Sequence, residues 1–123
     1  MISSISVVSI CVKDQAKAET FWCDKIGFEV VRKAPFEGHF WIQVAPHKDA
    51  EEMGQTTLSL FPRALDKEWK EKRASIVFQC DDIETMYKRL KDEGVQITKP
   101  ETMPWGTFCT FKDNDGNAFL LKE

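Results

Sequence analysis

Histidines and cysteines are the residues of this 123-residue sequence that could act as a base or a nucleophile near neutral pH. It contains two histidines, His39 and His47, and four cysteines that form no CxxC pair. Because an imidazole exchanges a proton near neutral pH, His39 is the candidate for a general base; the alternative is a solvated loop histidine. Structural zinc sites usually take their ligands as close-spaced pairs, so the cysteine spacing predicts no such site.

Aromatic and neutral polar residues form a second group, suited to binding. Trp105 lies in the tripeptide Pro104-Trp105-Gly106, where the proline ring stiffens the backbone that carries the indole. Trp41, Phe61 and Phe108 lie in segments where serines or glutamines recur with the same alternation. Aromatic walls with a few hydroxyls and amides are typical of pockets for flat or partly apolar ligands; the alternative is a closed core.

A repeated order of elements must position these residues. Apolar residues alternate along 7–12, and Asp14 is placed to cap a helix that ends at Gly27. The same alternation precedes Asp82, which is placed to cap a helix that ends at Gly94. The halves are thus offset by 67 to 68 positions, from Gly27 to Gly94 and from Asp14 to Asp82. This constant order of strand, capped helix and glycine indicates an internal repeat.

The rest of the chain is expected to form strands, turns and one linker. We expect one domain, residues 1–123, with module one at about 1–63, a charged linker at about 64–73 and module two at about 74–123. The linker has the composition for a short helix around Trp69. Alternation predicts the remaining strands at residues 39–45, 56–61, 107–111 and 118–121.

The composition limits the partners of the protein. Its net charge is −3, from 17 basic and 20 acidic side chains, so it sets up no basic field for nucleic acid or an anionic membrane. No apolar run approaches the roughly 18 residues of a membrane-spanning helix. The apolar stretch 5–12 is interleaved with serines and lacks the features of an export signal. We therefore expect a cytoplasmic protein with reduced cysteines.

Several local motifs accompany the repeat: Val12-Lys13-Asp14-Gln15, Phe21-Trp22, Lys25-Ile26-Gly27-Phe28-Glu29-Val30, Pro104-Trp105-Gly106-Thr107 and Phe111-Lys112-Asp113-Asn114-Asp115-Gly116-Asn117. With the βαβββ repeat, they resemble the vicinal oxygen chelate superfamily of glyoxalases, bleomycin-resistance proteins and extradiol dioxygenases, over essentially the whole chain. The resemblance implies an α+β fold in which two βαβββ modules form a curved mixed-sheet cup with helices on the convex face. It also implies a homodimer, with modules paired within one chain or exchanged across the dimer.

Alternation assigns the strand side chains to two faces. The apolar positions that must pack on the helices are Val8, Ile10, Val12, Phe40, Ile42, Val44, Leu58, Leu60, Ile76 and Phe78. The positions that must face the cup are Val7, Ser9, Cys11, Trp41, Gln43, Thr57, Ser59, Phe61, Ser75, Val77 and Gln79. The resemblance adds Phe108, Thr110, Ala118 and Leu120, where the period alone is ambiguous. We expect this cup to contain no carboxylate and no histidine.

The resemblance also identifies the positions where metal-dependent members carry their ligands. These correspond here to Val7, Thr57, Ser75 and Leu120. A divalent metal needs about three ligands from histidine, cysteine or carboxylate, which this set does not supply. We therefore expect no metal and no cofactor.

Together these features predict a metal-free protein that sequesters an aromatic or partly apolar small molecule. Two alternatives remain open. One is a lyase, isomerase or dioxygenase-type enzyme with displaced metal ligands or with His39 as its base, and the other is a dimeric interaction module without a small ligand. The expected ligand-binding residues are Ser9, Cys11, Trp41, Gln43, Ser59, Phe61, Ser75, Gln79, Trp105 and Phe108.

Overall fold

The computed structural model describes residues 1–66 and 76–123. The chain divides into two compact units, Met1–Arg73 and Ala74–Glu123, each with its own sheet and helix. Two expectations, the short helix around Trp69 and the cup position of Ser75, lie outside the described residues.

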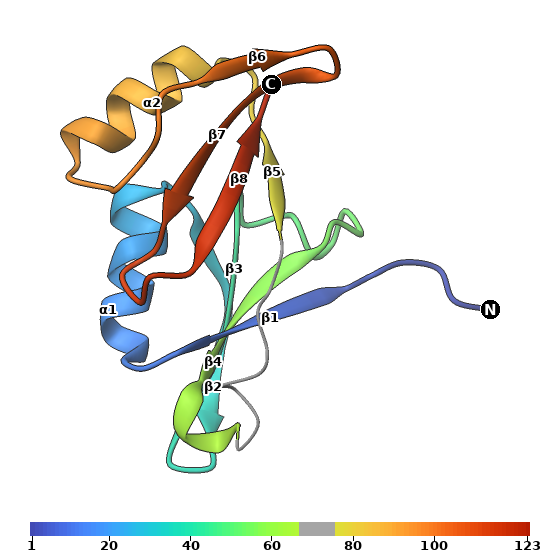
Figure 1. Ribbon diagram of the computed structural model, residues 1–123. Helices are drawn as coiled ribbons and strands as arrows, with labels where there is room; N and C mark the ends of the chain where they lie inside the picture. The colour runs from blue at the N-terminus through green and yellow to red at the C-terminus, as the bar shows by residue number, and fades with distance from the viewer. Residues whose placement is uncertain (67–75) are drawn as a thin grey trace. The chain divides into compact units, whose positions relative to one another are not determined.

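Unit 1 is a four-stranded mixed sheet with one helix (Figure 1). The strand order is β1-β4-β3-β2, in which β1 runs parallel to β4 and the other neighbours are antiparallel. The helix continues into one π-helical turn and packs against β4. The elements are β1 (Val7–Val12), α1 (Gln15–Thr20), the π-helical turn (Phe21–Lys25), β2 (Glu29–Phe36), β3 (His39–Ala45), β4 (Thr57–Pro62) and a 3₁₀ turn (Arg63–Leu65).

Unit 2 repeats this arrangement. Its strand order is β5-β8-β7-β6, with β5 parallel to β8 and the other neighbours antiparallel. The helix packs against β7. The predicted α+β fold of two βαβββ modules is confirmed by this common order. The elements are β5 (Val77–Gln79), α2 (Ile83–Asp92), β6 (Glu101–Met103), β7 (Gly106–Lys112) and β8 (Ala118–Lys122).

The helix ends follow from the sequence as predicted. Asp14 Oδ1 accepts a hydrogen bond from the Lys17 amide at 3.0 Å. Asp82 caps α2 by accepting from the Thr85 amide at 3.1 Å and from the Thr85 hydroxyl at 2.8 Å. Gly27 and Gly94, at φ of 92° and 78°, adopt the left-handed conformation that only glycine adopts without strain. The aspartate contacts satisfy helix-end amides that have no partner within the helix.

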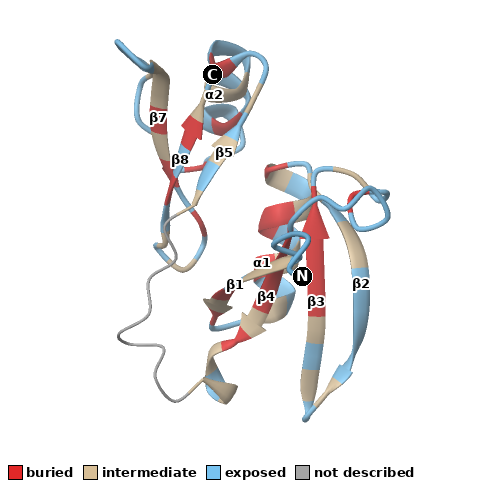
Figure 2. Ribbon diagram, turned by 90° about the vertical axis from the view of Figure 1, so that its right-hand side faces the viewer, coloured by how far each residue is buried: buried red, intermediate tan, exposed pale blue. Residues whose placement is uncertain are grey.

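One face of the unit 1 sheet forms the core together with α1. Trp22 is fully buried, and Figure 2 shows buried residues along α1, β3 and β4. The predicted core residues Ile10, Val12, Ile42, Val44, Leu58 and Leu60 are all buried.

Phe40 departs furthest from the predicted core, since 44% of it is exposed, whereas Val8, Ile76 and Phe78 are partly buried. Gln15, the first residue of α1, exchanges hydrogen bonds with the Phe40 backbone, so β3 extends past the start of the helix here. The Phe40 ring instead lies under the Lys33 ammonium, which is 5.0 Å from the ring centroid. Alternation assigned the face correctly but could not show where the covering helix begins.

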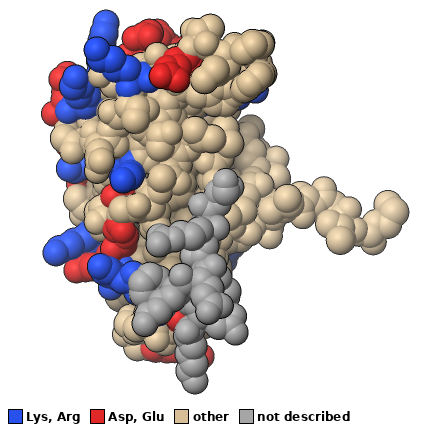
Figure 3. Space-filling model, in the orientation of Figure 1, with Lys and Arg blue, Asp and Glu red and all other residues tan. Residues whose placement is uncertain are grey.

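The surface carries charges of both signs. On the face shown in Figure 3, basic and acidic side chains lie intermixed. No helix in residues 1–66 and 76–123 is long and apolar enough to cross a membrane.

Replacing the buried indole by Trp22→Ala is expected to lower the free energy of unfolding by about 3–5 kcal/mol, because a large cavity remains in the core. Urea unfolding followed by circular dichroism measures this loss. The matched control is Trp105→Ala, where the indole is 68% exposed and the change should stay within about 0.5 kcal/mol. Equal losses in the two variants would contradict the assignment of the core.

Asp82→Ala should destabilise the protein in a pH-dependent way. The hydrogen bonds from Thr85 lower the pKa of Asp82 below its ordinary value of 3.8. A lowered pKa contributes stability that is present above the unfolded-state value and is lost as the pH falls through the folded-state value. The stability difference between wild type and variant should therefore be largest at neutral pH and shrink below about pH 4. Asp81→Ala removes the same charge without a capping bond, and a similar pH dependence there would contradict this explanation.

Candidate functional site

The sheet face of unit 1 opposite its core carries most of the predicted binding residues. Strand register holds them together, because Ser9 pairs with Ser59, Cys11 with Phe61, and Gln43 with Ser59. We call this the polar face of unit 1. It carries Val7, Ser9, Cys11, Trp41, Gln43, Thr57, Ser59 and Phe61.

Three aromatic rings meet on the polar face. Trp41 and Phe61 have ring centroids 6.4 Å apart, and Phe36 lies 6.2 Å from each of them. Phe36 was not predicted here. A β-bulge between Val30 and Arg32 shifts the register of β2, so that Phe36, like Arg32 and Ala34, faces the same side as Trp41. Because the bulge interrupts the alternation of side chains along β2, the sequence pattern does not predict the face on which Phe36 lies.

A chain of hydrogen bonds runs beside these rings. Trp41 Nε1 donates to Gln43 Oε1 at 2.6 Å. Gln43 Nε2 donates to Thr57 Oγ1 at 2.9 Å and to Glu51 Oε2 at 3.1 Å. Only 5% of Gln43 is exposed, so these partners satisfy an amide that would be costly to bury alone.

Glu51 and His39 correct the expectation that this face holds no carboxylate and no histidine. Glu51 comes from the loop after β3 and reaches the face through Gln43. The Arg32 guanidinium donates to Glu51 and holds the pKa of that carboxyl below its ordinary value. His39 pairs with Phe36 at the start of β3 and alternates onto the side of Trp41. Loop folding, which alternation does not predict, brings Glu51 here, whereas the position of His39 follows from the alternation of β3 itself.

The remaining predicted residues of unit 1 differ in their contacts. Ser59 is fully buried, and its hydroxyl finds no hydrogen-bond partner within the described part of the chain. The Cys11 thiol donates to Asp66 Oδ2 at 3.3 Å. Ser9 is exposed.

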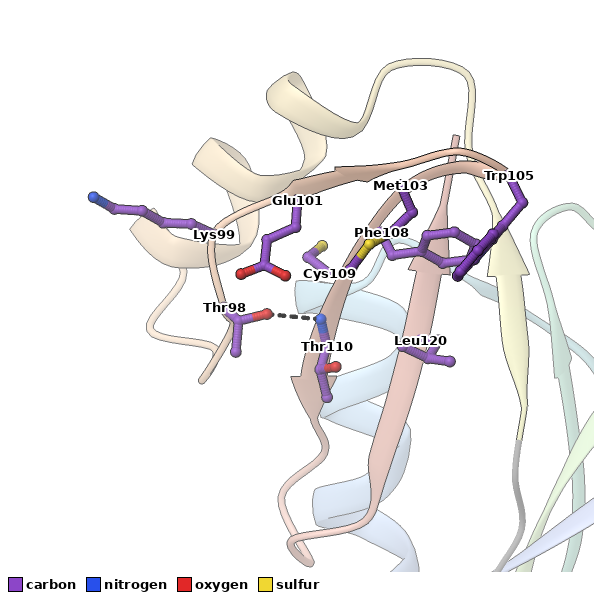
Figure 4. A pocket seen from close by; sticks show the side chains of 9 residues that line it. All are labelled: Thr98, Lys99, Glu101, Met103, Trp105, Phe108, Cys109, Thr110 and Leu120. Carbon is purple, nitrogen blue, oxygen red and sulfur yellow. Dashed lines mark hydrogen bonds between the residues drawn. The ribbon is translucent and has the colours of Figure 1, made fainter.

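Unit 2 contains an open groove of about 500 Å³ (Figure 4). Its walls are apolar and accessible, because Trp105 is 68% exposed, Met103 39% and Leu120 38%. The close-up shows the indole of Trp105 beside the ring of Phe108. The groove is lined by Thr98, Lys99, Glu101, Met103, Trp105, Phe108, Cys109, Thr110 and Leu120.

The sequence identified only part of this groove. Trp105 and Phe108 were predicted to bind ligand, and both line it. Glu101 and Met103 were missed because β6 has only three residues, too few for a period to emerge. Gln79 does not line the groove; it is exposed on β5, where its amide donates to the Cys80 carbonyl at 3.4 Å.

The residues at the family's metal positions do not fit a divalent metal. Val7 and Leu120 have no donor atoms in their side chains, and the Thr57 hydroxyl is engaged with Gln43 and with the Ser6 carbonyl. The fourth position, Ser75, lies outside the described residues. No cluster of three or more His, Cys, Asp or Glu side chains in residues 1–66 and 76–123 could hold a metal.

Burial also limits thiol chemistry in the groove. It raises the pKa of the Cys109 thiol to about 11. The thiol is therefore almost fully protonated at neutral pH, and only the thiolate is a strong nucleophile. Cys109 thus serves as an apolar wall.

Both a family model and a protein of similar sequence match nearly the whole chain. The family model for the Glyoxalase/Bleomycin resistance protein/Dioxygenase superfamily matches residues 4–121. The uncharacterized protein YetH of Bacillus subtilis (strain 168) is 45% identical, with 100% of each chain covered.

Solved structures show the same fold. TnmS3, described as an antibiotic binding protein from Streptomyces sp. CB03234, matches with a TM-score of 0.81 and 30% identity, covering 98% of this chain and 95% of its own. A Glyoxalase/bleomycin resistance protein/dioxygenase superfamily member from Sphaerobacter thermophilus DSM 20745 has a TM-score of 0.85 and 31% identity, with 99% and 98% covered.

Gln43→Leu is expected to lower the free energy of unfolding by about 1–3 kcal/mol, because Trp41 and Thr57 lose a buried partner. Urea unfolding provides the measurement. Gln79→Leu is the matched control on an exposed strand position and should change stability by less than about 0.5 kcal/mol. A Gln43→Leu variant as stable as wild type would show that the chain of hydrogen bonds contributes little.

Proposed function

The chain belongs to the Glyoxalase/Bleomycin resistance protein/Dioxygenase superfamily, and from this premise we propose that it is a metal-free protein that sequesters a flat aromatic or partly apolar small molecule. One observation carries the proposal. Accessible Trp105 and Phe108 line an open groove in which Leu120 stands where metal-dependent members carry a carboxylate. Such a site can stack and bury a ligand, but it has no donor set to activate one through a metal.

The similar structures support binding as the function. TnmS3 is an antibiotic binding protein, and its 30% identity to this chain extends over nearly the whole of both chains. A fold that hosts many chemistries does not establish function, so this similarity supports the proposal only together with the groove.

The polar face of unit 1 also carries groups with ligand-binding chemistry. Trp41 and Phe61 provide aromatic rings, and the fully buried Ser59 hydroxyl has no hydrogen-bond partner among the described residues. The proposed binding set also includes Ser9, Cys11, Gln43, Ser75 and Gln79. We further propose that the protein is cytoplasmic and forms a homodimer.

An enzyme of the lyase or isomerase type is the second candidate. The observation that favours it is the presence of Glu51 and His39 on the polar face. However, the Arg32 contact lowers the pKa of Glu51, whereas a general base works best with a pKa near the operating pH. Because the lowered pKa makes Glu51 a weak base, we favour ligand binding over catalysis as the function.

Flat aromatic compounds and a bleomycin-type glycopeptide should raise the melting temperature, since ligand at about 100 times its Kd stabilises the fold by about 2.7 kcal/mol. Trp105→Ala should weaken binding roughly threefold to tenfold, because an aromatic pair contributes about 0.5–1.5 kcal/mol beyond buried area. Thermal shift and isothermal titration calorimetry give both quantities. Met53→Ala removes another exposed apolar side chain, one that does not line the groove, and should leave the Kd unchanged.

Two results would contradict the proposal. One is a panel of such compounds in which none raises the melting temperature. The other is stoichiometric, tight binding of Ni, Zn, Mn or Fe ions to the untagged protein, which would return the metal-dependent enzyme to first place.

A further inference from the structure

A row of three side chains crosses the sheet of unit 2, and two of them, Glu101 and Phe108, line the groove. Strand register pairs Glu101 of β6 with Phe108 of β7, and Phe108 with Lys122 of β8. Residues paired in this way project from the same face of a sheet. We call Glu101, Phe108 and Lys122 the charge row, because a carboxylate and an ammonium flank one aromatic ring.

The carboxylate end of the charge row is directed into the groove. In Figure 4 the Glu101 side chain points inward, toward Thr98 and Thr110, whereas the amine of Lys99 extends away from the groove. The Glu101 carboxylate makes no hydrogen bond or ion pair with the other residues that the structure describes. Its charge is therefore available to a ligand.

The ammonium end lies against the aromatic ring. Lys122 Nζ is 6.0 Å from the centroid of the Phe108 ring, at the limit of a cation–π contact. The stem of Lys122 is held beside Gly106, since a Cβ placed on that glycine would lie 3.2 Å from Lys122 Cε. Glu123 is engaged elsewhere, because its carboxylate accepts from the Ile83 amide at 2.8 Å. Lys122 is thus held near the Phe108 ring, beside the residues that line the groove.

The spacing of the charge row limits the ligand. Neighbouring strands lie about 4.8 Å apart, so the backbones of Glu101 and Lys122 are about 10 Å apart, with Phe108 between them. A fused bicyclic or tricyclic ring with a substituent at each end spans this distance. Trp105 and Met103 give the ring a second contact, as flat and polarizable surfaces at the same groove.

We propose that the groove selects flat aromatic molecules that carry a cationic group at one end and an anionic group at the other, with the cation at Glu101 and the anion at Lys122. This inference rests on the proposed binding function and specifies its ligand class. Glu101 is exposed and Lys122 partly exposed, so each charge adds a modest gain in affinity on top of stacking.

Four naphthalene probes of the same ring size test the ligand class: a neutral one, one with an aminomethyl group, one with a carboxylate, and one with both groups at opposite ends. Isothermal titration calorimetry at low salt measures each Kd. Each charge should tighten binding roughly twofold to fivefold, so that the zwitterion binds tightest. Such a ranking supports the charge row.

Two variants that remove one charge each test which residue recognises which charged group of the ligand. Glu101→Gln should remove the gain from the aminomethyl group only, and Lys122→Met the gain from the carboxylate only. Lys99→Met and Glu93→Gln are matched controls, because Lys99 points away from the groove and Glu93 caps the C-terminal end of α2, outside the charge row. Neither control should change the ranking, and the thermal melting of all four variants verifies that they fold.

The outcomes separate the two proposals. If the neutral probe binds as tightly as the zwitterion, or if the two row variants have no selective effect, the charge row is overturned while aromatic binding stands. If none of the probes binds, including the neutral one, both the charge row and the proposed binding function fail for this groove.

Discussion

The structure depends on one constraint: each four-stranded sheet is covered by a single helix, which packs on only one of its faces. In unit 1 that face packs on α1 around the fully buried Trp22. In unit 2, Phe111 and Phe119 are buried, and their ring centroids lie 5.5 Å apart. Because strand side chains alternate, burying one face commits every second residue to the other. Function must be built from those remaining residues.

The two units use their remaining faces differently. In unit 1, Trp41, Gln43 and Glu51 satisfy one another, so the polar groups are held in a connected chain. Buried amides require such partners, because an unpaired one costs more than a hydrogen bond returns. In unit 2, Glu101 and Trp105 instead face an open groove. The rigid polar chain and the open groove are both consequences of sheets covered on one side.

The tight turn between β7 and β8 is held together by the hydrogen bonds of one aspartate. The buried Asp113 carboxylate accepts from the amides of Asp115 and Asn117 at 2.9 Å and from the Asn117 side chain at 3.0 Å. Burial outweighs these bonds and raises the pKa of Asp113. Its hydrogen bonds keep the turn compact, so that β7 and β8 stay in the register that places Phe108 beside Lys122. An acidic turn of this kind is structural, because its carboxylate is used by the turn's own amides.

The sequence by itself determined the repeat, the helix caps at Asp14 and Asp82, and the division of residues between the two strand faces. These features are local, since they depend on side-chain period and on hydrogen bonds to nearby amides. Only the tertiary structure decided that Phe36 joins the aromatic cluster, that Glu51 reaches Gln43, and that Glu101 lines the groove. A β-bulge, a folded loop and a three-residue strand place these residues, and each depends on pairing with another segment of the chain, which leaves no side-chain period within the residue's own segment.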